Sequence, residues 1–195
     1  CHHFGQGEEV RSTCQTSLTY SQFTNIICSM IKGQDIVVLA VLMEKGAEKL
    51  TYAELGKVAR VSVSEAHAAV GRLQESSLVN SERRLVKGHV SEFLVHGLRY
   101  AFPLRSAGKM DKGMPTAYAA PIAADSFAAT GLLPVWENSK GTVYGQTYEP
   151  IYVTAPAAAE GDARLYDRLA VIDMLRGGRL RERRFAERKI QELMA

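Results

Sequence analysis

The sequence predicts a mainly helical α+β protein with an extended, proline-punctuated middle. Dense helical patterns fill residues 30–102, all six prolines fall between Pro103 and Pro156, and a helical pattern returns from Asp162. Because proline lacks a backbone N–H and clashes with the preceding turn, the middle stretch cannot hold a long helix.

The composition is that of a globular protein. Of the 195 residues, 46% are hydrophobic and 23% are charged, with a formal net charge of +3; such values argue against wholesale disorder. The longest apolar run, Ile36–Met43, is too short to cross a bilayer, and no membrane association is expected. The three cysteines all lie in the first 28 residues and make no disulfide framework, so we expect a cytoplasmic protein.

Residues 1–29 differ from the rest of the chain. They are polar, lack periodicity and begin with Cys-His-His, and Met30 stands just before the first strong helical pattern. We interpret 1–29 as a flexible or non-native N-terminal extension and Met30 as the biological start. A native flexible arm is the alternative.

Two helices are predicted at the start of the next stretch. Gln34–Lys45 is apolar nearly all round, which indicates a well-buried helix, and Gly46 supplies a stop. Thr51 and Glu54 have the spacing of a capping box, which predicts the start of a second, short helix.

A third helix follows a tight turn, and Ser64 is predicted to cap it. Ala66, Val70 and Leu73, spaced i, i+4, i+7, define its inward face. A short helix, a turn and a second helix form a helix-turn-helix, whose second helix can enter the DNA major groove. We expect the exposed side of this segment to contact DNA through Ser62, Ser64, Glu65, His67, Ala68, Gly71 and Arg72.

Each of these residue types has a physical role in such contacts. Ala68 and Gly71 are small, so the helix backbone can approach base edges closely. Arg72 can pair with guanine or phosphate, and His67 can donate or accept a hydrogen bond. The free N–H groups of the first turn, with the two serine hydroxyls beside them, suit a phosphate. Glu65 repels phosphate unless it accepts from cytosine.

Two short apolar segments then flank a charged turn. Leu78–Asn80 and Leu85–Lys87 around Ser81–Arg84 predict a β-hairpin wing. Its cations would lie near flanking phosphates or the minor groove: Arg83, Arg84 and Lys87.

Gln34–Lys87 resembles the winged-helix domain of bacterial transcription regulators of the MarR-like type. The stretch LTYAELGKVARVSVSEAHAAVGRLQESSLV and the polar turn after it carry the resemblance, which covers about a third of the chain. It implies a homodimer that binds a pseudo-palindromic operator. The C-terminal half departs from that pattern, since such regulators have long dimerisation helices at both ends and no proline-rich middle.

The predicted organisation has four parts. After the extension, residues 30–102 form a winged helix-turn-helix DNA-binding domain. Residues 103–160 form an extended, Pro-rich region with short strands in Thr142–Val153 and with Trp136 as a core anchor. Residues 161–195 form a helical hairpin, broken at Gly177-Gly178.

The last helix is rich in arginine. Arg181, Arg184 and Arg188 align at i, i+3, i+7, a spacing that is unfavourable without a partner. Phosphates or an acidic protein surface would offset the repulsion; the alternative is a solvated face that pairs with its own glutamates, such as Arg188 with Glu192.

No enzyme motif is present, so no catalytic activity, cofactor or metal is expected. His89, Glu92 and His96 share a helix side, but three ligands on successive turns span too far for one ion. The sequence thus predicts a cytoplasmic transcription regulator, nucleoid-associated when bound to double-stranded DNA. Two alternatives stay open: an antitoxin-like module that binds a partner protein, and a ligand sensor whose pocket is lined by Trp136 and tyrosines.

Overall fold

The structure, a computed structural model, describes residues 30–128 and 131–194. The chain divides at Met30 into two units, and the second, Ile31–Ala195, holds all the helices and strands that are described. The interpretation of residues 1–29, with their cysteines, lies outside the described residues. None of the helices within the described ranges has the length and apolar character needed to cross a bilayer.

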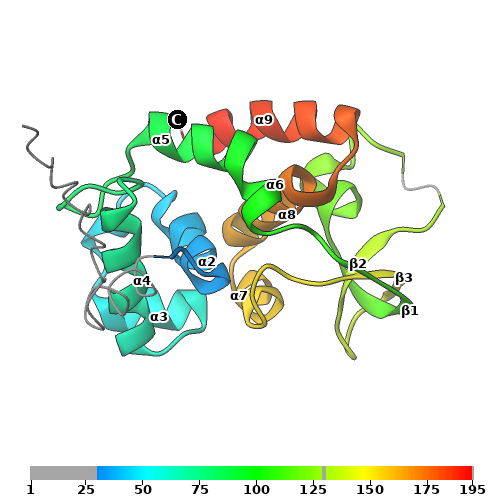
Figure 1. Cartoon of the computed structure of the whole chain (residues 1–195). Helices are drawn as coiled ribbons and strands as arrows, with labels where there is room; N and C mark the ends of the chain where they lie inside the picture. The colour runs from blue at the N-terminus through cyan, green and yellow to red at the C-terminus, as the bar shows by residue number, and fades with distance from the viewer. Residues whose placement is uncertain (1–29, 129–130, 195) are drawn as a thin grey trace, which may run out of the picture. The chain divides into compact units, whose positions relative to one another are not determined.

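Three helices pack together at the N-terminal end of this unit (Figure 1): α2 (Gly33–Leu42), α3 (Tyr52–Ala59) and α4 (Val63–Glu75). Every residue from Asp35 to Leu42 is buried, as the apolar pattern predicts, although the helix ends before the expected Lys45. Gly46 then adopts a φ of 85°, in the left-handed region that favours glycine, and precedes the 3-10 helix η1 (Ala47–Lys49).

A second helical segment follows α4. It consists of α5 (Lys87–Glu92), the π-helical turn η2 (Phe93–Gly97) and α6 (Leu98–Ala101). Val90, Leu94 and Leu98, spaced i, i+4, i+8, are fully buried along one side of it.

A small sheet forms the middle of the chain. Its strands are β1 (Ser106–Pro115), β2 (Pro134–Glu137) and β3 (Val143–Tyr148), and each pairs with the other two. Strand β1 is antiparallel to both partners, and β2 and β3 are parallel. The predicted strand within 142–153 is confirmed as β3, whereas β1 was not predicted because its sequence has no β-branched or aromatic residue.

Helix α8 (Ala163–Gly177) lies between the N-terminal helices and the strands (Figure 1). It contacts α2, α6 and the two neighbouring helices, α7 (Ala155–Gly161) and α9 (Leu180–Met194), as well as the 3-10 helices η3 (Ala117–Ala119) and η4 (Pro121–Ala123). Residues from all three predicted stretches therefore contribute to one core.

A buried polar cluster joins α8 to the sheet region. Trp136 Nε1 and Thr116 Oγ1 donate to Asp173 Oδ2 at 2.7 and 2.9 Å, and Arg176 Nη1 donates to Oδ1 at 2.7 Å. Burial raises the pKa of Asp173, and the positive charge of Arg176 opposes that rise. The prediction that Trp136 anchors this region is confirmed, since its side chain is 1% exposed.

The break between α8 and α9 falls at the predicted glycine pair. A Cβ on Gly177 would lie 2.2 Å from the Leu104 side chain, and one on Gly178 would lie 2.4 Å from the Met174 carbonyl oxygen. Close packing therefore requires both glycines. The mixed α+β class is confirmed.

Candidate nucleic-acid interface

Helices α3 and α4 both begin with a capping box. Thr51 Oγ1 accepts from Glu54 N at 3.2 Å, and Glu54 Oε2 accepts from Thr51 N at 2.8 Å. At α4 the same exchange joins Ser62 and Glu65, at 3.2 and 2.9 Å. The prediction that Ser64 caps α4 is wrong, because Ser62 occupies the cap and the helix begins at Val63.

A three-residue turn connects the two helices. Arg60 ends α3 in the left-handed region, with a φ of 56°, and Val61 N donates back to the Gly56 carbonyl at 2.9 Å. A Cβ on Gly56 would lie 2.9 Å from the Val61 carbonyl oxygen. The turn is therefore tight enough to require a glycine in α3.

Helix α4 has one buried and one exposed side. Ala66, Ala69, Val70 and Leu73 are at most 1% exposed and pack on the core. Ser64, His67 and Ala68 are exposed, and Gly71 is half-buried, with open space where a Cβ would point. We call this side the outer face of α4; it comprises Val63, Ser64, His67, Ala68, Gly71 and Glu75.

Arg72 does not belong to the outer face, and its expected contact with DNA is corrected by the structure. Arg72 Nε and Nη2 donate to the Asp35 carboxylate at 2.8 and 2.6 Å. The residue is 8% exposed and Asp35 is 0% exposed. The guanidinium is thus directed into the protein, because α2 supplies a buried carboxylate that must be paired.

Glu65 and the serines are engaged within the helix start. The hydrogen bond from Ser62 N, with a second from its hydroxyl, holds the pKa of Glu65 below its usual value. Ser62 Oγ also lies 3.1 Å from Ser64 Oγ. The predicted phosphate site therefore has fewer hydrogen-bond donors than expected, because the N–H of Glu65 and the Ser62 hydroxyl already have partners.

Three side chains pack together at the edge of the outer face: His67 of α4, Tyr52 of α3 and Arg83 of the turn after α4. The His67 ring lies 4.8 Å from the Tyr52 ring, centroid to centroid, and the Arg83 guanidinium lies 5.1 Å from the centre of the same tyrosine ring. Arg83 Nη1 donates to the Leu50 carbonyl at 2.6 Å. The expectation that Arg83 projects toward flanking phosphates is wrong, because its guanidinium packs on α3.

The predicted hairpin is present only as a minimal turn. Val79 and Leu85 form one antiparallel bridge, and the Asn80 side chain accepts from the backbone of Glu82 and Arg84. Arg84 is exposed at the tip, where it pairs with Glu82 at 3.3 Å. Lys87, expected in the wing, is instead the exposed first residue of α5.

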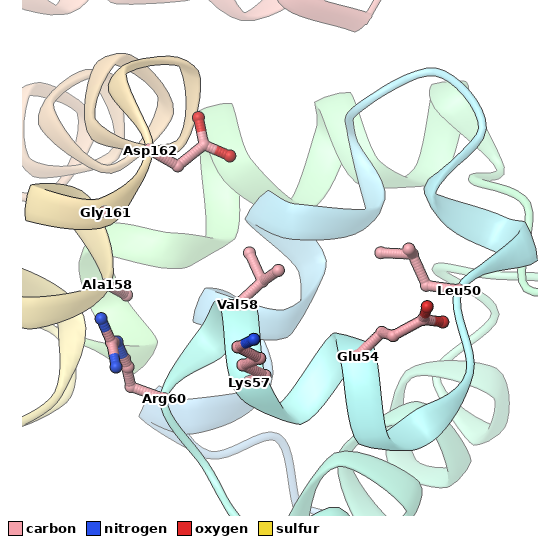
Figure 2. Close-up of a pocket in the computed structure, with 8 residues that line it drawn as sticks. All are labelled: Leu50, Glu54, Lys57, Val58, Arg60, Ala158, Gly161 and Asp162. Carbon is pink, nitrogen blue, oxygen red and sulfur yellow. The ribbon is translucent and has the colours of Figure 1, made fainter.

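A hollow of about 400 Å³ opens on the other side of α3, against α7 and the start of α8 (Figure 2). Its lining is mainly apolar and also includes two cations, Lys57 and Arg60, and two carboxylates, Glu54 and Asp162. Figure 2 shows the residues that line it: Leu50, Glu54, Lys57, Val58, Arg60, Ala158, Gly161 and Asp162. The alternative of a pocket lined by Trp136 and tyrosines does not match this hollow.

His89 and His96 of the second helical segment line one surface hollow together with Glu92. His89 Nδ1 lies 2.9 Å from the Ser77 carbonyl oxygen. Within the described ranges, no three His, Cys, Asp or Glu side chains are arranged to hold a metal ion.

The arginine-rich face of α9 is partly engaged. Arg181 donates to the Ser126 carbonyl at 2.9 Å, and Lys189 pairs with Glu192 at 2.6 Å. Arg184 and Arg188 are exposed. Glu192 thus pairs with Lys189 and not with Arg188, the partner suggested by the sequence.

Three exposed residues beside the predicted contact residues were not predicted from the sequence: Val63, Lys57 and Arg60. Val63 is 54% exposed although its spacing from Ala66 and Val70 places it with the apolar stripe.

Comparison with protein-family models, curated proteins and solved structures finds no match to this chain.

Proposed function

We propose that this chain is a sequence-specific DNA-binding protein that regulates transcription as a homodimer. The single observation that carries the proposal is the outer face of α4. It is exposed, it carries small side chains at positions 64, 68 and 71, and the core supports the helix from behind. A helix of this kind fits the major groove, where the backbone must approach base edges.

The neighbouring elements support the same use. In this proposal, the tight turn after α3 and the short hairpin after α4 would serve as the turn and the wing of a winged helix-turn-helix. Arg60 in the turn and Arg84 in the hairpin are exposed cations that would add sequence-independent attraction to phosphates; Arg84 also pairs with Glu82.

A dimer is proposed on physical grounds. One short helix contacts too few bases for useful specificity, and two copies about 34 Å apart along the duplex remedy this. The protein would then act on a pseudo-palindromic operator in the cytoplasm, associated with the nucleoid.

A charge placed on the outer face tests the proposal. Ala68→Glu puts a carboxylate among phosphates and base edges, and Ala157→Glu makes the same change at an exposed helical alanine of α7. Like charges facing each other at an interface are strongly unfavourable, so Ala68→Glu should weaken binding to a selected duplex by about tenfold or more. Ala157→Glu should leave it unchanged.

Binding is measured by fluorescence anisotropy with duplexes selected from a random pool, and sedimentation measures the stoichiometry. Circular dichroism checks that both variants are folded. Equal binding by both variants would refute the proposed interface. Loss of binding on neutralising Arg184 and Arg188 instead would place it on α9.

A further inference from the structure

We infer that α4 selects thymine-containing DNA, with Val63 as the residue that contacts a thymine methyl group. The inference rests on the proposed function and adds to it the class of sequence that is bound. Its basis is which groups the outer face offers and which it lacks.

The outer face lacks the usual means of selecting guanine. Arg72 is the sole Arg or Lys in the sequence of α4, and its guanidinium pairs with buried Asp35. A bidentate Arg or Lys contact with guanine is the commonest specific contact in the major groove. Selection by α4 must therefore use other groups of the base edges.

Val63 offers an exposed apolar group at the position that meets bases first. It is the first residue of α4 and remains 54% exposed. In a helix-turn-helix, the N-terminal residues of the second helix contact base edges. The apolar group that a base edge presents in the major groove is the C5-methyl of thymine.

The other residues of the outer face are compatible with this contact. His67 lies one turn after Val63, and its ring is held against Tyr52 at 4.8 Å, so it brings one oriented donor or acceptor. Ala68 adds a second methyl group, and Gly71 leaves open space for the duplex. The face thus combines apolar groups with the His67 ring, the Ser64 hydroxyl and, at its C-terminal end, the Glu75 carboxylate.

Deoxyuridine substitution isolates the methyl group. A duplex is first selected from a random pool with the full chain, and each thymine is then replaced in turn by deoxyuridine, which removes only the methyl. Burying one such group strengthens binding by about fourfold, so we expect a loss of that size at the contacted position. At that position Val63→Ala, which lacks both γ-methyl groups, should distinguish the thymine and deoxyuridine duplexes less than the parent protein does, whereas Val63→Ile should distinguish them as well as the parent does.

Val153→Ala is the matched control, since Val153 is a 78% exposed valine outside α4; it should retain the full difference. If no thymine in a selected duplex is sensitive to substitution, or if Val63→Ala keeps the full sensitivity, the inference is overturned while the proposed function stands. If no duplex is bound at all, both are overturned.

Discussion

Replacing Arg72 with alanine separates a stabilising role from a DNA-binding one. The change removes the arginine partner of the Asp35 carboxylate, which is 0% exposed in the parent protein and also accepts from the backbone N–H of Lys32 at 2.7 Å. Two charge-assisted hydrogen bonds are lost, each worth about 1.5–3 kcal/mol. Breaking one partner of a buried pair costs about 3–5 kcal/mol. We therefore expect Arg72→Ala to lower the free energy of unfolding by about 3 kcal/mol or more.

Urea unfolding, followed by far-ultraviolet circular dichroism, measures this loss. With a slope of about 2 kcal/mol per molar urea, the midpoint should fall by about 1.5 M. In an Asp35→Asn background the same substitution should cost less, because no buried charge is left unpaired; the difference between the two costs is the coupling energy.

The opposite pattern would refute the conclusion that Arg72 stabilises the core rather than contacting DNA. If Arg72→Ala unfolds at the urea concentration of the parent protein and yet loses affinity for a selected duplex, the guanidinium contacts DNA rather than stabilising the core.

Four further substitutions test the packing, a buried hydrogen bond and an ion pair of the fold. Gly113→Ala places a Cβ 2.1 Å from the Trp136 carbonyl oxygen and should lower the free energy of unfolding by about 2 kcal/mol or more; Gly88→Ala, with open space around it, should change that quantity by less than about 1 kcal/mol. Trp136→Phe removes a donor to buried Asp173 and should cost about 1–3 kcal/mol in urea unfolding. The hydrogen bond from Arg168, with further bonding and charge from α8, holds the pKa of Glu44 below its usual 4.5. Its stabilisation is therefore present above that value and is lost as the pH falls through the lowered pKa. Between about pH 5 and pH 3, the melting temperature of Glu44→Gln should fall less steeply than that of the parent protein.

Each of these predictions has a result that would contradict it. Equal stability of the two glycine variants would mean that β1 and β2 do not approach as closely as described. If Trp136→Phe leaves the free energy of unfolding unchanged, the buried Asp173 carboxylate does not need the hydrogen bond from the indole N–H. Parallel acid profiles for Glu44→Gln and the parent would exclude the ion pair as a source of stability.

Local signals determined much of the helical part of the fold. The spacing of Thr51 and Glu54 predicted a capping box, and the structure has one. The spacing of Ala66, Val70 and Leu73 predicted the buried side of α4, and all three are buried. Such features depend on residues three to seven positions apart, which a sequence shows directly.

Tertiary structure alone decided the partners that lie far apart in the sequence. Helical spacing places Arg72 near the polar side of α4, and only the fold brings it to Asp35, 37 residues earlier. The same holds for β1, whose residues have little strand propensity and become a strand by pairing with β2 and β3. A buried carboxylate must find a cation and a strand must find its neighbours, and only the packed chain determines which ones they meet.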